Sequence, residues 1–428
     1  MGDRGRGPSA VAGRTVAGRD FRLFWFGETA SLLGTSIGSV ALPLVAVVAL
    51  GAGPFTVGLL TAVAWLPWLV FGLPAGVWID RLSRRRMMLV CNGVSFAAFA
   101  SIPVAAWFGA LSTGHLLVAA TVGGCANVFF TTAYRAYLPA LLAHGELLSG
   151  NTWLQGSAST MQVLGPGAAG LLAQSIGAVS GLAADALSFG VSALCLRAIR
   201  TVEPRPEARR RRLRDEVARG LRFITRDPFL RGLVAFSAVS NVALTGMSSI
   251  EVVFLVDTLD AGQGAVGLVL AVCGCGGVVG AVLSARIAGR FGTARAALLC
   301  QGAAASMALL MPLAGPGAGL LFFAVGGAGL GCGVVASCVI TDTFRQQYCP
   351  PGLIARVSAS SAVVTYGAIP LGGLLGGGLG SALGVRTTLW CMTVLQALSL
   401  TILLAGPIRG LRDFPLPGTD VKPVKLKS

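Results

Sequence analysis

Long apolar segments alternate with short polar segments along almost the whole chain of 428 residues. Twelve of the apolar segments reach the length of about 20 residues that a helix needs to cross a bilayer. Most of them begin and end at Gly, Pro or a cluster of charged residues, as helices commonly do. The pattern predicts an all-α integral membrane protein with transmembrane helices at residues 22–50, 55–78, 87–109, 114–137, 147–173, 180–199, 230–256, 263–288, 295–314, 317–341, 352–382 and 385–406.

One connection is longer than the others and divides the predicted spans into six and six. Within it, Val217, Leu221 and Ile224 would share one face of a helix over residues 213–225. Such a helix would lie along the membrane surface with its arginines near anionic headgroups, and a solvated linker is the alternative. The predicted organisation is an N-terminal tail at 1–21, a first six-helix bundle at 22–199, a basic linker at 200–229, a second six-helix bundle at 230–406 and a C-terminal tail at 407–428.

The placement of the charged residues predicts which side of the membrane each loop occupies. The chain carries 33 Lys and Arg against 17 Asp and Glu, and its net charge of +16 alone would suit a nucleic-acid partner. When the loops are assigned alternately to the two sides, however, one side receives 32 of these cations and the other receives only Arg386. Because cytoplasmic loops are enriched in Lys and Arg, both termini are predicted to be cytoplasmic, and no nucleic-acid partner is expected.

Little in the chain is suited to enzyme chemistry. Its 10 Cys are scattered through apolar segments without a CxxC pair, and it has 2 His. We therefore expect no metal site, disulfide framework or cofactor. The sequence also lacks the HExxH motif of metalloproteases and the GxxxxGK[ST] loop of ATP-driven pumps, so it is predicted not to be an enzyme.

The two halves of the chain repeat similar short sequences in the same order. The matching pairs are RDFRLF (19–24) with RDPFLRGL (226–233), TVGLL (56–60) with AVGLVL (265–270), YRAYLPALL (134–142) with FRQQYCPPGL (344–353), and GPGAAGLL (165–172) with IPLGGLLGG (369–377). An ordered series of matches at similar spacing is typical of two parallel repeats, here of six helices each.

The stretch GLPAGVWIDRLSRRRMML at residues 72–89 resembles the signature of the major facilitator superfamily between its second and third helices, a run that ends in G-x-x-x-D-R-x-x-R-R. Residues 169–206 and 215–233 resemble the bacterial branch of small-molecule exporters that includes macrolide- and siderophore-efflux proteins. The resemblance implies the major facilitator fold, with 12 transmembrane helices in two pseudo-symmetric bundles.

The same resemblance implies a secondary active transporter of a bacterial cell membrane that works by alternating access. The expected substrate is a small, largely hydrophobic organic molecule, such as a drug, an antibiotic or another secondary metabolite. It would be exported by a monomer in exchange for protons, with the proton gradient as the energy source. An importer or uniporter of a small metabolite is the alternative in the same class, and a transporter-like membrane sensor is the alternative of another class.

Within the signature, an acid among arginines is the strongest candidate for a gating role. By the resemblance, Asp80 would cap the start of a helix in the other half, around residues 352–356, and latch the halves together in the outward-facing state. The second repeat has Gly289 in the position of this acid. The arginines would hold the loop at the lipid headgroups; they are Arg81, Arg84, Arg85 and Arg86.

Glycines one helical turn apart let helix backbones approach closely in lipid. Gly72 and Gly76 form such a pair before the latch, and Gly276 and Gly280 form another. A longer ladder of predicted packing glycines consists of Gly372, Gly376, Gly380 and Gly384.

Three carboxyl groups fall inside predicted spanning helices. The charged form of an acid is costly there, so each is a candidate for taking up and releasing protons. We rank Glu28 in the first span before Glu251 in the seventh, its counterpart in the repeat, and before Asp185 near the outer end of the sixth.

Cations and further acids on two related helices are also candidates for proton coupling. Arg135 lies near the cytoplasmic end of the fourth span, where an interfacial anchor is an equal alternative. Asp342 and Arg345, its counterparts in the tenth span, are spaced to pair on one helix face.

The fifth predicted span resembles the kinked helix of antiporters at Gly165, Pro166 and Gly170, although Met161 stands where that motif has a glycine. Proline removes a backbone hydrogen bond and bends a helix, whereas the glycines permit close packing. The substrate path is expected at mid-membrane, between the halves. The candidate cavity residues are Asn127, Gln162, Asn241, Thr245 and Trp65.

Overall fold

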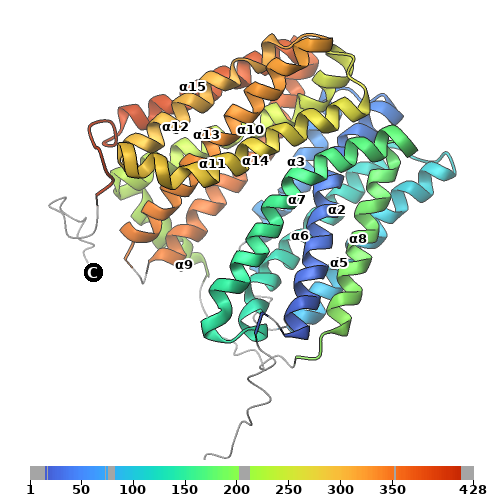
Figure 1. Ribbon diagram of the computed structural model, residues 1–428, viewed down its shortest axis with the longest axis horizontal. Helices are drawn as coiled ribbons and strands as arrows, with labels where there is room; N and C mark the ends of the chain where they lie inside the picture. Colours follow the sequence, from blue (N-terminus) through green and yellow to red (C-terminus); the bar gives the residue numbers. More distant parts are fainter. Residues whose placement is uncertain are drawn as a thin grey trace, which may run out of the picture. The chain divides into compact units, whose positions relative to one another are not determined.

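The computed structural model describes residues 15–16, 18–72, 74–75, 82–201, 213–350 and 353–415, and its regular structure there is helical. Before the linker lie α2 (Arg19–Leu44), α3 (Pro54–Phe71), α5 (Arg84–Trp107), α6 (Thr113–Leu141), α7 (Leu147–Ile176) and α8 (Val179–Ala198) (Figure 1). After it lie α9 (Leu213–Arg226), α10 (Pro228–Val253), α11 (Gln263–Phe291), α12 (Thr293–Ala308), α13 (Leu320–Tyr348), α14 (Ile354–Leu383) and α15 (Val385–Ala405).

Within the described residues, 11 helical segments are long and apolar enough to cross a membrane, and each coincides with a predicted span. The other predicted span, at 147–173, is present as α7 but is too polar to be counted among them. The largest differences in bounds are at the span predicted to end at residue 341, where α13 continues to Tyr348, and at the span predicted to reach residue 78. There α3 ends at Phe71 and Gly72 forms a turn, because Gly72 and Pro74 disfavour continuation of the helix.

Contacts divide the chain into two compact units, Met1–Leu50 with Val70–Arg210, and Gly51–Leu69 with Arg211–Ser428. The sequence pattern assigned the whole of the second span to the first bundle, whereas the structure groups its residues 51–69 with the second unit. The reason is a close approach of two helix backbones: a Cβ atom added to Gly58 would lie 2.7 Å from Cα of Gly377. Helix α3 therefore packs tightly on α14.

The internal repeat is visible in the backbone. Helices α2 and α10 both continue into a five-residue π-helical turn, at Val45–Ala49 and Phe254–Thr258. Residues with positive φ occur at matching positions in the two halves. Those in the first half are Gly51, Gly109 and Gly177, and a nearly constant number of residues separates each of them from its counterpart in the second half, Asp260, Gly317 and Gly384 respectively. Corresponding spans thus end in the same way in the two halves.

Most of the predicted packing glycines lie at close contacts between helices. Gly276 and Gly280 face α13, where added Cβ atoms would lie 2.7 Å from Cα of Ala328 and 2.9 Å from Cα of Cys332. Gly372 and Gly376 face α10, and Gly380 faces Pro54. The predicted ladder is wrong at its last step, because Gly384 follows the end of α14 with φ 84° and packs against nothing within 4 Å.

Helix α9 occupies the predicted position in the linker and packs against protein along part of its length. Ile224 is buried in a cluster with Leu230 and Val234 of α10, and Gly220 lies against the backbone of Arg356 in α14. Leu221 is 43% exposed, and the side chain of Val217 lies outside the described residues. The helix is therefore docked on α14 at Gly220 and on α10 at Ile224, which the solvated-linker alternative did not anticipate.

Candidate functional site

Helix α7 carries a row of polar side chains that the rest of the chain leaves largely uncovered. Thr152, Gln155, Ser159 and Gln162 are spaced three or four residues apart and so share one helix face. Ser159 is half-buried and the other three are exposed. The hydrocarbon core of a bilayer offers such groups no hydrogen-bond partners, so this face indicates a path open to water or to a polar ligand. We refer to these four residues as the α7 polar stripe.

A second polar row follows α6. Asn127, Thr131 and Arg135 are four residues apart, and the Thr131 hydroxyl donates a hydrogen bond of 3.2 Å to Oδ1 of Asn127. Asn127 and Arg135 are exposed. The first unit therefore contributes two of the predicted cavity residues, Asn127 and Gln162, on exposed helix faces.

Helix α2 contacts both of these helices and places Glu28 beside them. The indole of Trp25 donates a hydrogen bond of 2.8 Å to Ser157 of α7, and Phe24 stacks on Tyr134 of α6 with ring centroids 5.4 Å apart. Glu28, one turn further along α2, is half-buried and interacts electrostatically with Tyr134. Within the described residues its carboxyl group has no hydrogen bond or ion pair, so its protonation state is not fixed by a protein partner.

Asp185 lies in a different place, at the contact between α8 and α2. Its side chain is 2% exposed, and a Cβ atom added to Gly38 would lie 2.9 Å from its Cγ. Its Oδ1 has no hydrogen-bond partner in the part of the chain that the structure describes. A buried carboxylate without a partner is costly in its charged form, so Asp185 stays a candidate proton carrier away from the polar rows.

In the second unit a polar row follows α10. Ser237, Asn241, Thr245 and Ser248 share one face of the helix, and Asn241 donates a hydrogen bond of 2.8 Å to the carbonyl oxygen of Ser237. Ser248 donates one of 3.4 Å to Glu251. The structure thus brings three predicted residues, Asn241, Thr245 and Glu251, onto one helix, with Glu251 in its last turn just before the π-helical segment.

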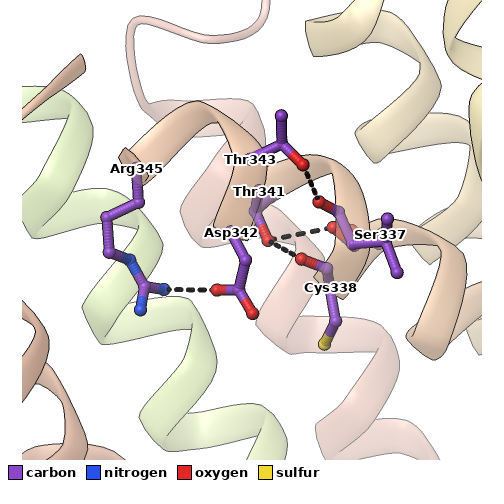
Figure 2. Close-up of polar contacts among 7 residues, drawn as sticks. Ser337, Cys338, Thr341, Asp342, Thr343 and Arg345 are labelled. Atoms are coloured by element: carbon purple, nitrogen blue, oxygen red, sulfur yellow. Dashed lines mark hydrogen bonds and ion pairs between the residues drawn. The ribbon is translucent and has the colours of Figure 1, made fainter. Parts of the chain in front are cut away.

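Asp342 and Arg345 of α13 form an ion pair with an N–O distance of 3.3 Å (Figure 2). The Asp342 side chain is 59% exposed, so the pair is partly solvated and contributes little to stability. Thr341 and Thr343 beside it donate hydrogen bonds to carbonyl oxygens of their own helix. The two charges neutralise each other locally, as their spacing predicted.

The arginines of the signature make contacts that the sequence did not predict. Arg84 donates a hydrogen bond of 3.0 Å to the carbonyl of Ala136, and Arg85 donates to the carbonyls of Leu196 and Arg197 at 2.9 and 2.8 Å. Cations are favoured at helix C-termini, so these two side chains fasten the start of α5 to the ends of α6 and α8. The predicted latch residues Gly76, Asp80 and Arg81 lie outside the described residues.

The antiporter-like segment lies at the contact between α7 and α2. A Cβ atom added to Gly165 would lie 3.1 Å from Cα of Ser36, and Gly170 is also buried. Helix α7 continues through Pro166 from Leu147 to Ile176. The glycines thus serve close packing of α7 on α2.

Several residues of these rows were not predicted from the sequence. Thr152, Gln155 and Ser159 recur with the helical period and could have been found by following polar positions, not only apolar ones, along residues 147–173. Trp65, predicted in the cavity, lies beside Trp68 and Tyr366, and no local pattern links residues so far apart in sequence.

Comparison with known proteins identifies relatives along nearly the whole chain. A family model described as Major Facilitator Superfamily matches residues 24–373. The multidrug efflux pump Tap of Mycobacterium tuberculosis is 27% identical over 413 residues, which cover 93% of this chain and 96% of the pump. Macrolide efflux protein A of Streptococcus pyogenes is 20% identical over 371 residues, which cover 86% of this chain and 90% of that protein.

Solved structures share the fold at lower sequence identity. The nucleoside transporter NupG has a TM-score of 0.74 at 10% identity, over 90% of this chain and 98% of that chain. A bacterial homologue of the iron transporter ferroportin in its inward-facing state has a TM-score of 0.74 at 15% identity, over the same shares of the two chains. These likenesses confirm the predicted all-α membrane fold, and the relatives are transporters and not enzymes, as predicted.

Proposed function

The chain belongs to the major facilitator superfamily, and from that premise we propose that it exports a small, largely hydrophobic organic molecule in exchange for protons. The efflux pump and the macrolide efflux protein among its relatives support export over import. The proposed location is a bacterial cell membrane with both termini in the cytoplasm, because 32 of the 33 Lys and Arg fall on that side.

The observation that carries this proposal is the α7 polar stripe. A spanning helix with amide and hydroxyl groups exposed along one face is costly in lipid unless that face lines a path for water or substrate. Asn127 and Arg135 on α6 extend the polar surface, and α2 contacts both helices. The stripe has no charged residue, which suits an organic substrate with a few hydrogen-bonding groups.

Proton coupling is proposed to act through Glu28, because it lies on α2, which contacts both α6 and α7. Its neighbour Tyr134 is next to Arg135 in the chain, so Glu28 lies close to the α6 row. Protonation removes a charge that is costly to enclose and thereby favours one of the two access states. Asp185 and Glu251 are the alternative carriers.

The direction of transport is tested in cells of a bacterial host without its own efflux pumps. Expression of the chain should lower the steady-state accumulation of ethidium, a planar hydrophobic cation, and replacement of Gln155 and Gln162 by Leu should restore it. Ser175→Leu is the matched control, because Ser175 is exposed on α7 outside the stripe and bonds only to carbonyls of its own helix. Higher accumulation in expressing cells would identify an importer and contradict the proposal.

A further inference from the structure

Three aromatic rings from α3 and α14 converge in the second unit. The ring centroids of Trp68 and Tyr366 lie 5.2 Å apart, those of Trp65 and Tyr366 lie 6.0 Å apart, and those of Trp65 and Trp68 lie 6.5 Å apart. All three side chains are half-buried, so part of each ring surface is accessible. We refer to Trp65, Trp68 and Tyr366 as the aromatic trio.

The trio contains a hydrogen-bond donor without a partner. Nε1 of Trp68 is buried and has no acceptor among the described residues. Trp25, by contrast, donates from its indole to Ser157 at 2.8 Å. A buried indole N–H usually has a partner, and leaving it unsatisfied costs free energy. Trp68 therefore carries a buried donor that no described group of the protein satisfies, on a ring clustered with Trp65 and Tyr366.

The helices that carry the trio are held at a fixed, short separation. Gly58 of α3 lies against Gly373 and Gly377 of α14, with 2.9 Å between an added Gly58 Cβ and the Gly377 nitrogen. Trp65 and Tyr366 are each seven residues, or about two turns, from Gly58 and Gly373 respectively. Because the glycine contact fixes the two backbones, the rings are pre-organised, which lowers the entropic cost of binding a flat molecule.

We propose that the aromatic trio is a binding site for planar aromatic compounds that carry a hydrogen-bond acceptor, such as a carbonyl oxygen. The ligand stacks on the accessible ring surfaces, and Nε1 of Trp68 donates to its acceptor. This assignment rests on the proposed function and narrows the substrate class, since aliphatic compounds cannot stack on the rings. It also assigns a role to Trp68 and Tyr366, which lie outside the polar rows.

The test measures binding of two fluorescent probes to the full chain in lipid nanodiscs, with the signal of empty nanodiscs subtracted. Acridone is planar and has a carbonyl group, whereas anthracene has the same ring outline without an acceptor. Trp68→Phe keeps a ring and removes the donor, so it should weaken acridone binding by about 10-fold, the value of one hydrogen bond, and leave anthracene unchanged. Tyr366→Leu should weaken the binding of both probes.

Trp107→Phe is the matched control, because Trp107 is 89% exposed at the end of α5. Equal acridone affinity in Trp68→Phe and Trp107→Phe would overturn the proposal, and so would an equal loss of both probes in Trp68→Phe. Proton-driven efflux of acridone is measured on the same proteins. Trio-dependent acridone binding without such efflux would refute the proposed function alone, whereas efflux without trio-dependent binding would refute the site alone.

Discussion

Two acidic residues of α2, Asp20 and Glu28, differ in whether their carboxyl groups accept hydrogen bonds from the protein. The carboxylate of Asp20 accepts a hydrogen bond of 2.8 Å from the backbone N–H of Thr201 and another from that residue's hydroxyl. This acid ties the start of α2 to the end of α8. Glu28, two turns further along α2, has no such bond in the part of the chain that the structure describes, and it lies near Tyr134. Because its carboxyl group makes no hydrogen bond there, Glu28 can change its protonation state without breaking a structural contact.

Replacement of Glu28 by Gln should separate proton coupling from substrate movement. Gln keeps the size of the side chain and cannot release a proton, so efflux driven by a pH gradient should fall to the level of empty liposomes. Exchange of labelled for unlabelled substrate without a gradient should persist, because it needs no net proton transfer. Both rates are measured in proteoliposomes.

Asp260→Asn is the control for this substitution. Asp260 is exposed in a loop and has φ 51°, a conformation that Asn also tolerates. If Glu28→Gln retains gradient-driven efflux at the rate of Asp260→Asn, Glu28 is not the proton carrier.

At the scale of elements, glycine decides how closely neighbouring helices pack. Alanine at Gly276 or Gly280 would place a methyl group within 2.9 Å of the α13 backbone, and we expect a loss of about 1–3 kcal/mol in stability. Alanine at Gly289, on the same helix α11 but with nothing within 4 Å, should instead stabilise by about 0.5–1 kcal/mol through helix propensity. The melting temperature in detergent should fall for the variants at Gly276 and Gly280 and rise for the variant at Gly289. Equal melting temperatures for the three variants would contradict this prediction.

The docking of α9 gives a second prediction at this scale. Cys349 is 3% exposed beside Ile224 of α9, and burial raises the pKa of its thiol to about 11. The reactive thiolate is therefore scarce at pH 8, and Cys349 should react slowly with N-ethylmaleimide. Gly220→Ala would press against the Arg356 backbone, displace α9 and speed the reaction.

This rate is measured in a background where the other cysteines are replaced. Gly232→Ala on α10 is the control, because nothing lies within 4 Å of its added Cβ atom. Equal labelling rates in the two variants would show that α9 does not cover Cys349.

The helices themselves could be predicted from sequence because spanning a bilayer needs long apolar runs with polar ends. The end of α3 at Phe71 was missed, since it depends on local turn chemistry within an apolar run, and Gly384 was wrongly counted among the packing glycines although it follows the end of α14. The partners of Arg84 and Arg85 could not be foreseen either. Their carbonyl acceptors are supplied by the ends of α6 and α8, and only tertiary packing brings them near.

At the scale of the whole molecule, the two halves share a backbone pattern and differ in chemistry. The π-helical ends of α2 and α10 and the matched left-handed residues mark the repeat. Yet α7 exposes amide groups, whereas its counterpart α14 carries glycines packed against α3 and α10. Glu28 belongs to the first unit and the aromatic trio to the second. We therefore propose that the first unit carries proton exchange and the second unit carries aromatic recognition.

The central claim is that export is driven by protons moving the opposite way, and flux in proteoliposomes tests it most directly. Vesicles containing the purified chain are loaded with ethidium and placed in a more acidic medium. We predict that ethidium leaves the vesicles while the gradient lasts, and that a protonophore abolishes this efflux. Efflux at an unchanged rate in the presence of the protonophore would contradict proton-coupled export.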